Sequence, residues 1–86
     1  MKLDDYQSRA ATTAIYPSEK GIEYTALGLA SEAGEVASIV SKWIRGDKEK
    51  INETDIAKEL GDVLWFVGMM AHELDIKLST IATINL

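Results

Sequence analysis

The sequence predicts an all-α protein, a small bundle of about four helices that is completed by oligomerisation. Apolar residues recur at helical spacing over long stretches, and the chain contains a single proline, Pro17. No segment shows sustained alternation of apolar and polar residues, which is the pattern of a half-buried strand. The apolar run 63–67 would fit a strand by itself, but it lies inside a longer helical pattern.

The first two helices are expected on either side of Pro17. The first should span residues 3–16, because proline disfavours helix in the residue before it, and Ser18 should cap the helix that follows. The second should begin at about Glu19 or Glu23 and end at Arg45. Gly46 follows, and glycine is the residue type most common just after the end of a helix.

The third and fourth helices follow a polar connection. Residues 52–55 offer N-cap side chains and acids for the first turn of a helix that should reach about Leu74. Ser79 or Thr80 is expected to cap a short last helix ending at Leu86. Short connections favour antiparallel neighbours in a bundle.

Four glycines lie inside the expected second and third helices. Each costs about 1 kcal/mol relative to alanine in a helix interior, so some local need should explain it. We expect them to let the two helices approach closely or to leave room for a ligand. They are Gly28, Gly34, Gly61 and Gly68.

Size and composition narrow the class of protein. The 86 residues suggest one domain, 1–86, and the absence of cysteine excludes disulfides and thiolate metal sites. A net charge of −5 argues against nucleic acid as a partner, and no apolar run is long enough to cross a membrane. The acidic start, residues 1–5, is unlike a secretory signal, so we expect a cytoplasmic protein. Apolar residues all around the third helix favour a homodimer or homotetramer.

An acidic motif occurs twice. Glu32 and Glu35 are three residues apart with a glycine before the second, and Glu59 and Asp62 repeat this arrangement. At that spacing both acids of a pair share one helix face, here the apolar face that should point into the core. Four carboxylates there would repel one another and lose hydration, so a cation should compensate them.

Oxygen-only ligands suit hard cations such as Mg²⁺, Mn²⁺ or Ca²⁺. Zinc usually requires histidine or cysteine, and the only histidine is His72. A di-iron bundle would need Glu-x-x-His, but Met69 stands three residues before His72. Two alternatives remain: a solvated acidic face, or acids paired with lysines of a neighbouring subunit.

These residues carry a family resemblance. The combination Glu32-x-x-Glu35 and Glu59-x-x-Asp62, with the blocks 33–36 and 60–64 and the earlier Asp5-Tyr6-Gln7, resembles MazG-type nucleoside triphosphate pyrophosphohydrolases. That family belongs to an all-α superfamily shared with dimeric dUTPases. The resemblance covers nearly the whole chain.

The resemblance implies a Mg²⁺-dependent enzyme, with Mn²⁺ as a possible substitute. The family cleaves a nucleoside triphosphate between its α and β phosphates, giving a monophosphate and pyrophosphate, here with nucleotide-pool house-cleaning as the expected role. By resemblance, the metal ligands are Glu32, Glu35, Glu59 and Asp62, and Glu35 also orients or deprotonates the attacking water.

Other residues are weaker candidates for nucleotide contacts. Lys42, Arg45, Lys48 and Lys50 could meet phosphates, and Trp43 or Trp65 could stack on a base, with an oligomer interface as another place for Trp65. Tyr6, Gln7 and Asn85 could touch the nucleotide. A helix-dipole role for the cations and core packing for the aromatic rings are the alternatives.

Two departures from the family pattern leave a second function open. The first is Ser31, where a further glutamate is common. The second concerns the basic residues that commonly follow the asparagine, here Asn85, which are missing or lie beyond Leu86. The alternative is a non-catalytic relative that oligomerises or binds nucleotide or metal.

Overall fold

The computed structural model describes residues 1–86 and is entirely helical, which confirms the predicted all-α class. Its elements in chain order are α1 (Leu3–Ala11), the short 3₁₀ helix η1 (Ser18–Lys20), α2 (Gly21–Ile44), α3 (Glu53–Glu73) and α4 (Leu78–Asn85). None of these helices is long and apolar enough to cross a membrane.

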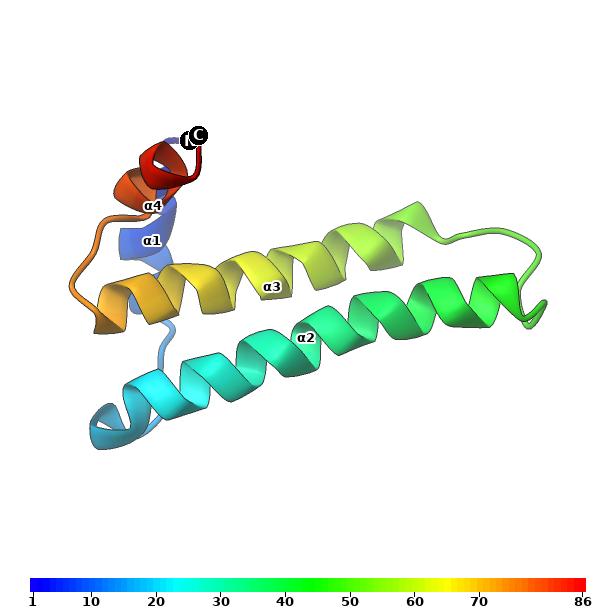
Figure 1. Ribbon diagram of the computed structural model, residues 1–86, viewed down its shortest axis with the longest axis horizontal. Coiled ribbons are helices and arrows are strands. Elements are labelled where there is room, and N and C mark those ends of the chain that lie inside the picture. The colour runs from blue at the N-terminus through cyan, green and yellow to red at the C-terminus, as the bar shows by residue number, and fades with distance from the viewer.

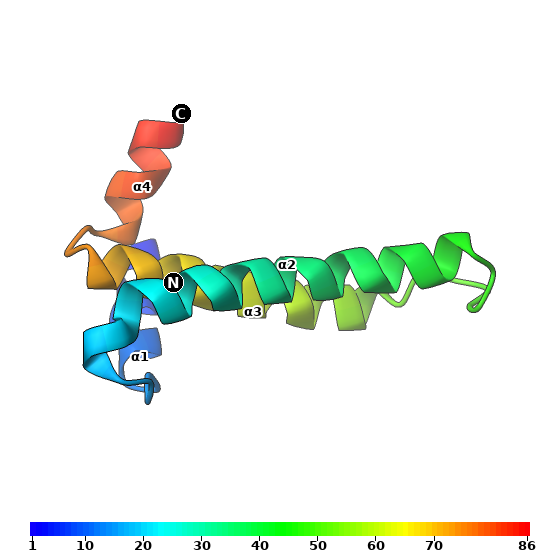
Figure 2. The same ribbon diagram turned by 60° about the horizontal axis from the view of Figure 1, so that its bottom comes forward.

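Helices α2 and α3 form a long antiparallel hairpin, and the other helices gather at its open end (Figure 1). Figure 2 shows α1 and α4 extending from that end in opposite directions. At Gly28 a Cβ atom would lie 2.1 Å from Cε1 of Phe66, so the absence of a side chain lets the Phe66 ring rest against α2. This confirms the expected close approach at one of the four glycines.

The small core lies where α1, α3 and α4 meet. Only 8 of the 86 residues are buried, among them Met69, Ala71 and Leu78, and Met69 is fully enclosed. Toward the connection between α2 and α3, the two helices have only each other to pack against. A single chain therefore leaves most of the hairpin without a core of its own.

Gln7 ties three elements together through its buried side-chain amide. Its Nε2 donates to the carbonyl oxygens of Gly68 in α3, at 3.2 Å, and of Ile76, at 2.9 Å. Its Oε1 accepts a 2.9 Å hydrogen bond from the N–H of Leu78, the first residue of α4. One turn earlier in α1, the Asp4 carboxylate accepts hydrogen bonds from both the N–H and the hydroxyl of Ser79.

Two helix ends differ from the sequence predictions because side chains intervene. Helix α1 stops at Ala11, not Tyr16, and the hydroxyls of Thr12 and Thr13 bond back to carbonyl oxygens of its last turn. Helix α4 is capped by Asp4 and Gln7 of α1 rather than by Ser79 or Thr80.

The remaining predicted helix signals have mixed outcomes. Ser18 does not cap α2; it begins η1, and no side chain caps the start of α2. Asn52 caps α3 as predicted, since its Oδ1 accepts a 3.1 Å hydrogen bond from the N–H of Asp55. Gly46 follows α2 with a φ of 93°, a left-handed conformation that favours glycine.

Candidate metal centre

Three of the predicted metal ligands converge between α2 and α3. Glu32 on α2 and Glu59 and Asp62 on α3 each offer a carboxylate oxygen, and these three oxygens lie within 4.8 Å of one another. Because α2 and α3 run antiparallel, the two copies of the acidic motif meet across the hairpin. The repeat in the sequence thus becomes one cluster in space.

The cluster lies at an open face and not inside a core. Glu32 and Glu59 are half-buried, whereas Asp62 and the fourth acid, Glu35, are exposed. The prediction that all four acids point into the core is therefore wrong for Asp62 and Glu35. The reason is that α2 has no helix other than α3 beside it apart from the short η1, so a flank of the hairpin remains open.

Glu59 is the most constrained member of the cluster. Its Oε2 is buried and has no hydrogen-bond partner. The pKa of Glu59 is raised above its ordinary value, first because protonation would let Glu59 donate a hydrogen bond to the neighbouring Glu32 carboxylate, then by burial. The negative charges of Glu32, Asp62 and Glu35 raise it further.

No cation of the protein compensates these carboxylates. The two ion pairs of the chain, Lys20–Glu23 and Arg45–Asp47, involve other acids. The buried Oε2 of Glu59 lies beside two further carboxylates, so negative charge accumulates there. No positive group of the protein balances this charge. The donor set, oxygen alone, suits a hard divalent cation.

A hollow of about 650 Å³ opens where α2 connects to α3. Lys42 and Trp43, both predicted nucleotide contacts, line it together with Lys48 and Lys50 of the connection, and Glu53 and Asp55 of α3 line it too. We refer to it as the basic hollow, because its lysines outnumber its acids by one. The three lysines form no ion pair, and Trp43 is 41% exposed. Ile39, one turn beyond Glu35 on α2, also lines the hollow, so this basic surface adjoins the acidic motif.

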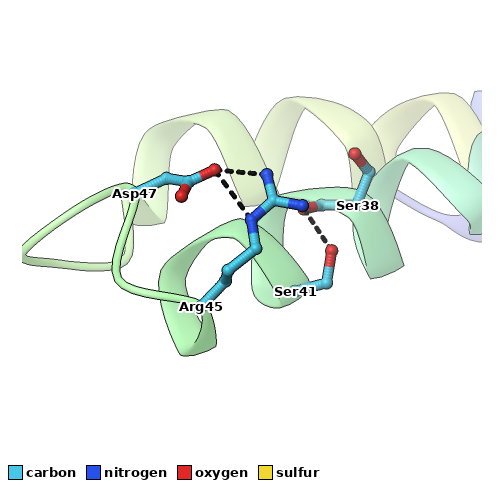
Figure 3. Close-up of polar contacts among 4 residues, drawn as sticks. All are labelled: Ser38, Ser41, Arg45 and Asp47. Carbon is cyan, nitrogen blue, oxygen red and sulfur yellow. Dashed lines mark hydrogen bonds and ion pairs between the residues drawn. The ribbon is translucent and has the colours of Figure 1, made fainter.

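The other predicted nucleotide contacts lie elsewhere in the single chain. Arg45 turns its guanidinium toward Asp47, in the turn that follows α2, and not into the basic hollow (Figure 3). Gln7 is buried and uses its amide within the protein. Asn85 is exposed in the last turn of α4, which extends away from the hairpin (Figure 2).

Tyr6, which the sequence suggested as a possible nucleotide contact beside Gln7, lies on the side of the cluster that faces α1. It is half-buried on α1, and its pKa is raised by burial and then by the negative charge of Asp62. The sequence offered one signal for it, its position in the Asp5-Tyr6-Gln7 block.

Comparisons with known proteins identify the family of the chain. A family model described as the MazG nucleotide pyrophosphohydrolase domain matches residues 20–85. The Gene 37 protein of Mycobacterium phage L5 is 44% identical over 96 residues, an alignment that covers 100% of this chain and 83% of the phage protein. No solved structure matches the chain.

Proposed function

The chain belongs to the MazG nucleotide pyrophosphohydrolase family. On that premise we propose that it hydrolyses nucleoside triphosphates, with Mg²⁺, to nucleoside monophosphates and pyrophosphate. Removal of unwanted nucleotides from the cellular pool is the role that we propose for this reaction. The single observation that supports the proposal most strongly is the buried, unpartnered Oε2 of Glu59 within the cluster of three carboxylates.

The carboxylates fit a divalent cation in number, chemistry and placement. Glu32, Glu59 and Asp62 would hold Mg²⁺, or Mn²⁺ in its place. Glu35 follows Glu32 by three residues on α2, so its carboxylate could join them as a fourth ligand. Bound Mg²⁺ would supply positive charge that attracts the triphosphate and stabilises charge developing on its phosphate oxygens.

The remaining steps belong to side chains of the protein. Glu35 is exposed, so its carboxylate can accept a proton from an attacking water. The unpaired Lys42, Lys48 and Lys50 provide positive charge for the phosphates that leave as pyrophosphate. Three lysines outnumber the two acids that line the same hollow, Glu53 and Asp55, although the chain as a whole has a net charge of −5. This local excess of positive charge favours a phosphate site.

We further propose that a second copy of the chain covers one flank of the hairpin. At 100° per residue, one flank of α2 carries positions 22, 26, 29, 33, 40 and 44. The adjoining flank of α3 carries positions 56, 60, 64, 67 and 71, and is continued by the C-cap residue 74. All twelve are apolar, and several large ones are exposed, including Ile44 at 74% and Leu60 at 53%. Glu35 and Asp62 lie on the opposite flank, which stays open.

The area and charge of this flank suit self-association. A helix of 24 residues is about 36 Å long, and two helices present a face about 20 Å wide, or about 700 Å². A stable interface buries about 800 Å² per partner. Because the flank carries no charge, two copies with the same net charge can meet there without direct repulsion.

Light scattering should show a dimer or tetramer of the wild type. Leu60→Lys should shift this oligomer toward monomer.

The activity is tested by pyrophosphate release from a panel of triphosphates with and without Mg²⁺. We expect Mg²⁺-dependent release that is lost in Glu59→Gln, with helical content retained. Mg²⁺ should also raise the melting temperature of the wild type but not of the variant. Mg²⁺ stabilisation without turnover would identify a non-catalytic relative, and turnover by Glu59→Gln equal to wild type would refute the site.

A further inference from the structure

A second hollow lies between α1 and α3 on the side of Asp62. It has a volume of about 450 Å³, within the range of small-molecule sites, and its lining is mainly apolar. Tyr6, Arg9, Thr12, Thr13 and Trp65 form its walls. We refer to it as the aromatic hollow.

The aromatic hollow adjoins the carboxylate cluster. Trp65 follows Asp62 by three residues on α3, so the two side chains are neighbours on the helix surface. Tyr6 approaches from α1, and its ring lies against α3 at Gly68, where a Cβ atom would be 3.7 Å from Cε1 of Tyr6. A ligand bound to the carboxylates would therefore have this hollow within one helical turn.

The Trp65 ring is held in one orientation. Its Nε1 donates a 3.0 Å hydrogen bond to Oγ1 of Thr13, which itself donates to the carbonyl of Ala10. Phe66 and Tyr16 meet the indole edge to face, with ring centroids 5.0 and 6.4 Å away. A half-buried indole fixed in this way offers a flat apolar surface to the hollow without an ordering cost on binding.

Arg9 is the only charged side chain in the lining of the aromatic hollow, which Met1, with its N-terminal amine, lines as well. Arg9 is exposed and forms no ion pair. A guanidinium can stack on a planar ring or donate hydrogen bonds to ring carbonyl oxygens. Two aromatic rings and a free guanidinium around one cavity are a combination that recognises a heteroaromatic ring.

We propose that the aromatic hollow binds the nucleobase of the triphosphate. The carboxylates then lie between this hollow and the basic hollow, so the base points toward α1 and the terminal phosphates toward the connection between α2 and α3. This inference rests on the proposed function, because it assumes a nucleotide at the carboxylates. It assigns the base to Trp65 and Tyr6, and not to Trp43 in the basic hollow.

The test measures binding independently of turnover. An α,β-methylene nucleoside triphosphate, which resists cleavage at the scissile bond, is titrated with Mg²⁺ into wild type, Trp65→Leu, Trp65→Phe and Arg9→Ala by calorimetry. Lys20→Ala, an exposed cation outside both hollows, is the matched control for Arg9→Ala. Inorganic tripolyphosphate, which has no base, is titrated in parallel.

We expect Trp65→Leu to bind the analogue about 10-fold to 100-fold more weakly, the usual effect of losing one base-stacking ring. Trp65→Phe should recover part of that affinity, Arg9→Ala should bind several-fold more weakly, and tripolyphosphate affinity should stay constant. Because Arg9 is exposed, its substitution leaves the core intact.

Three outcomes would overturn the inference. They are unchanged analogue affinity in both Trp65→Leu and Arg9→Ala, an equal loss of tripolyphosphate affinity, and a loss on Trp43→Leu with none on Trp65→Leu. Failure of the proposed function gives a different result. Wild type would then release no pyrophosphate from any triphosphate, while its binding of the analogue would still respond to the Trp65 variants.

Discussion

Replacing Gln7 with leucine should destabilise the protein strongly, because this one side chain joins α1, α3 and α4. Leucine keeps much of the volume but loses three hydrogen bonds, those to Gly68, Ile76 and Leu78. Each bond contributes about 1 kcal/mol net, and buried partners left unpaired cost more. We therefore expect a loss of about 3 kcal/mol in the free energy of unfolding.

That loss is large compared with the whole stability. A chain of 86 residues is expected to have a free energy of unfolding of about 4–13 kcal/mol. A loss of 3 kcal/mol should lower the melting temperature by roughly 12–24 °C. Urea denaturation followed by circular dichroism measures it, at several protein concentrations because self-association would add to the apparent stability.

Ser8→Ala is the matched control, since Ser8 is the exposed neighbour on the same helix. A change below about 1 kcal/mol in Gln7→Leu would refute the reasoning that the amide clamps the three helices. Weaker nucleotide binding at unchanged stability would instead support the prediction that Gln7 contacts the nucleotide.

Two further predictions concern stability alone. The pKa of Asp4 is lowered from 3.8, mainly by the hydroxyl and N–H of Ser79, so its contribution is complete above pH 3.8 and is lost as the pH falls through the lowered value. Asp4→Asn should therefore be less stable than wild type at pH 5–7 in urea titrations, and a gap that fails to narrow below pH 3.8 would contradict this. Gly28→Ala should cost about 1–3 kcal/mol, because its Cβ would strike the Phe66 ring. Gly34→Ala, with nothing within 4 Å, should instead gain up to about 1 kcal/mol in metal-free protein, and equal effects of the two would be inconsistent with the packing.

The sequence alone located the candidate site because its spacing is local. Two acids three residues apart must share a helix face whatever surrounds the helix, so the convergence of Glu32 with Glu59 and Asp62 needed only an antiparallel hairpin. The end signals at Gly46 and the Asn52 cap act within a few residues, and both were predicted correctly.

The packing around the four helix glycines could not be predicted from the sequence. All four have the same helix propensity, yet only Gly28 meets a ring of the neighbouring helix at close range, whereas Gly34 and Gly61 face open space. Which glycine is packed depends on where Phe66 lies in space, and the spacing within one helix cannot give that position.

The sequence by itself determined the helices, the pairing of acids on them and the family to which the chain belongs, because periodicity and motif spacing are properties of neighbouring residues. Only the tertiary structure decided that Asp4 and Gln7 start α4, that Asp62 and Glu35 stay exposed, and that Tyr6 and Trp65 enclose a hollow beside them. These features join residues more than 50 positions apart in the chain or depend on which neighbours a helix lacks, and both follow from packing in three dimensions.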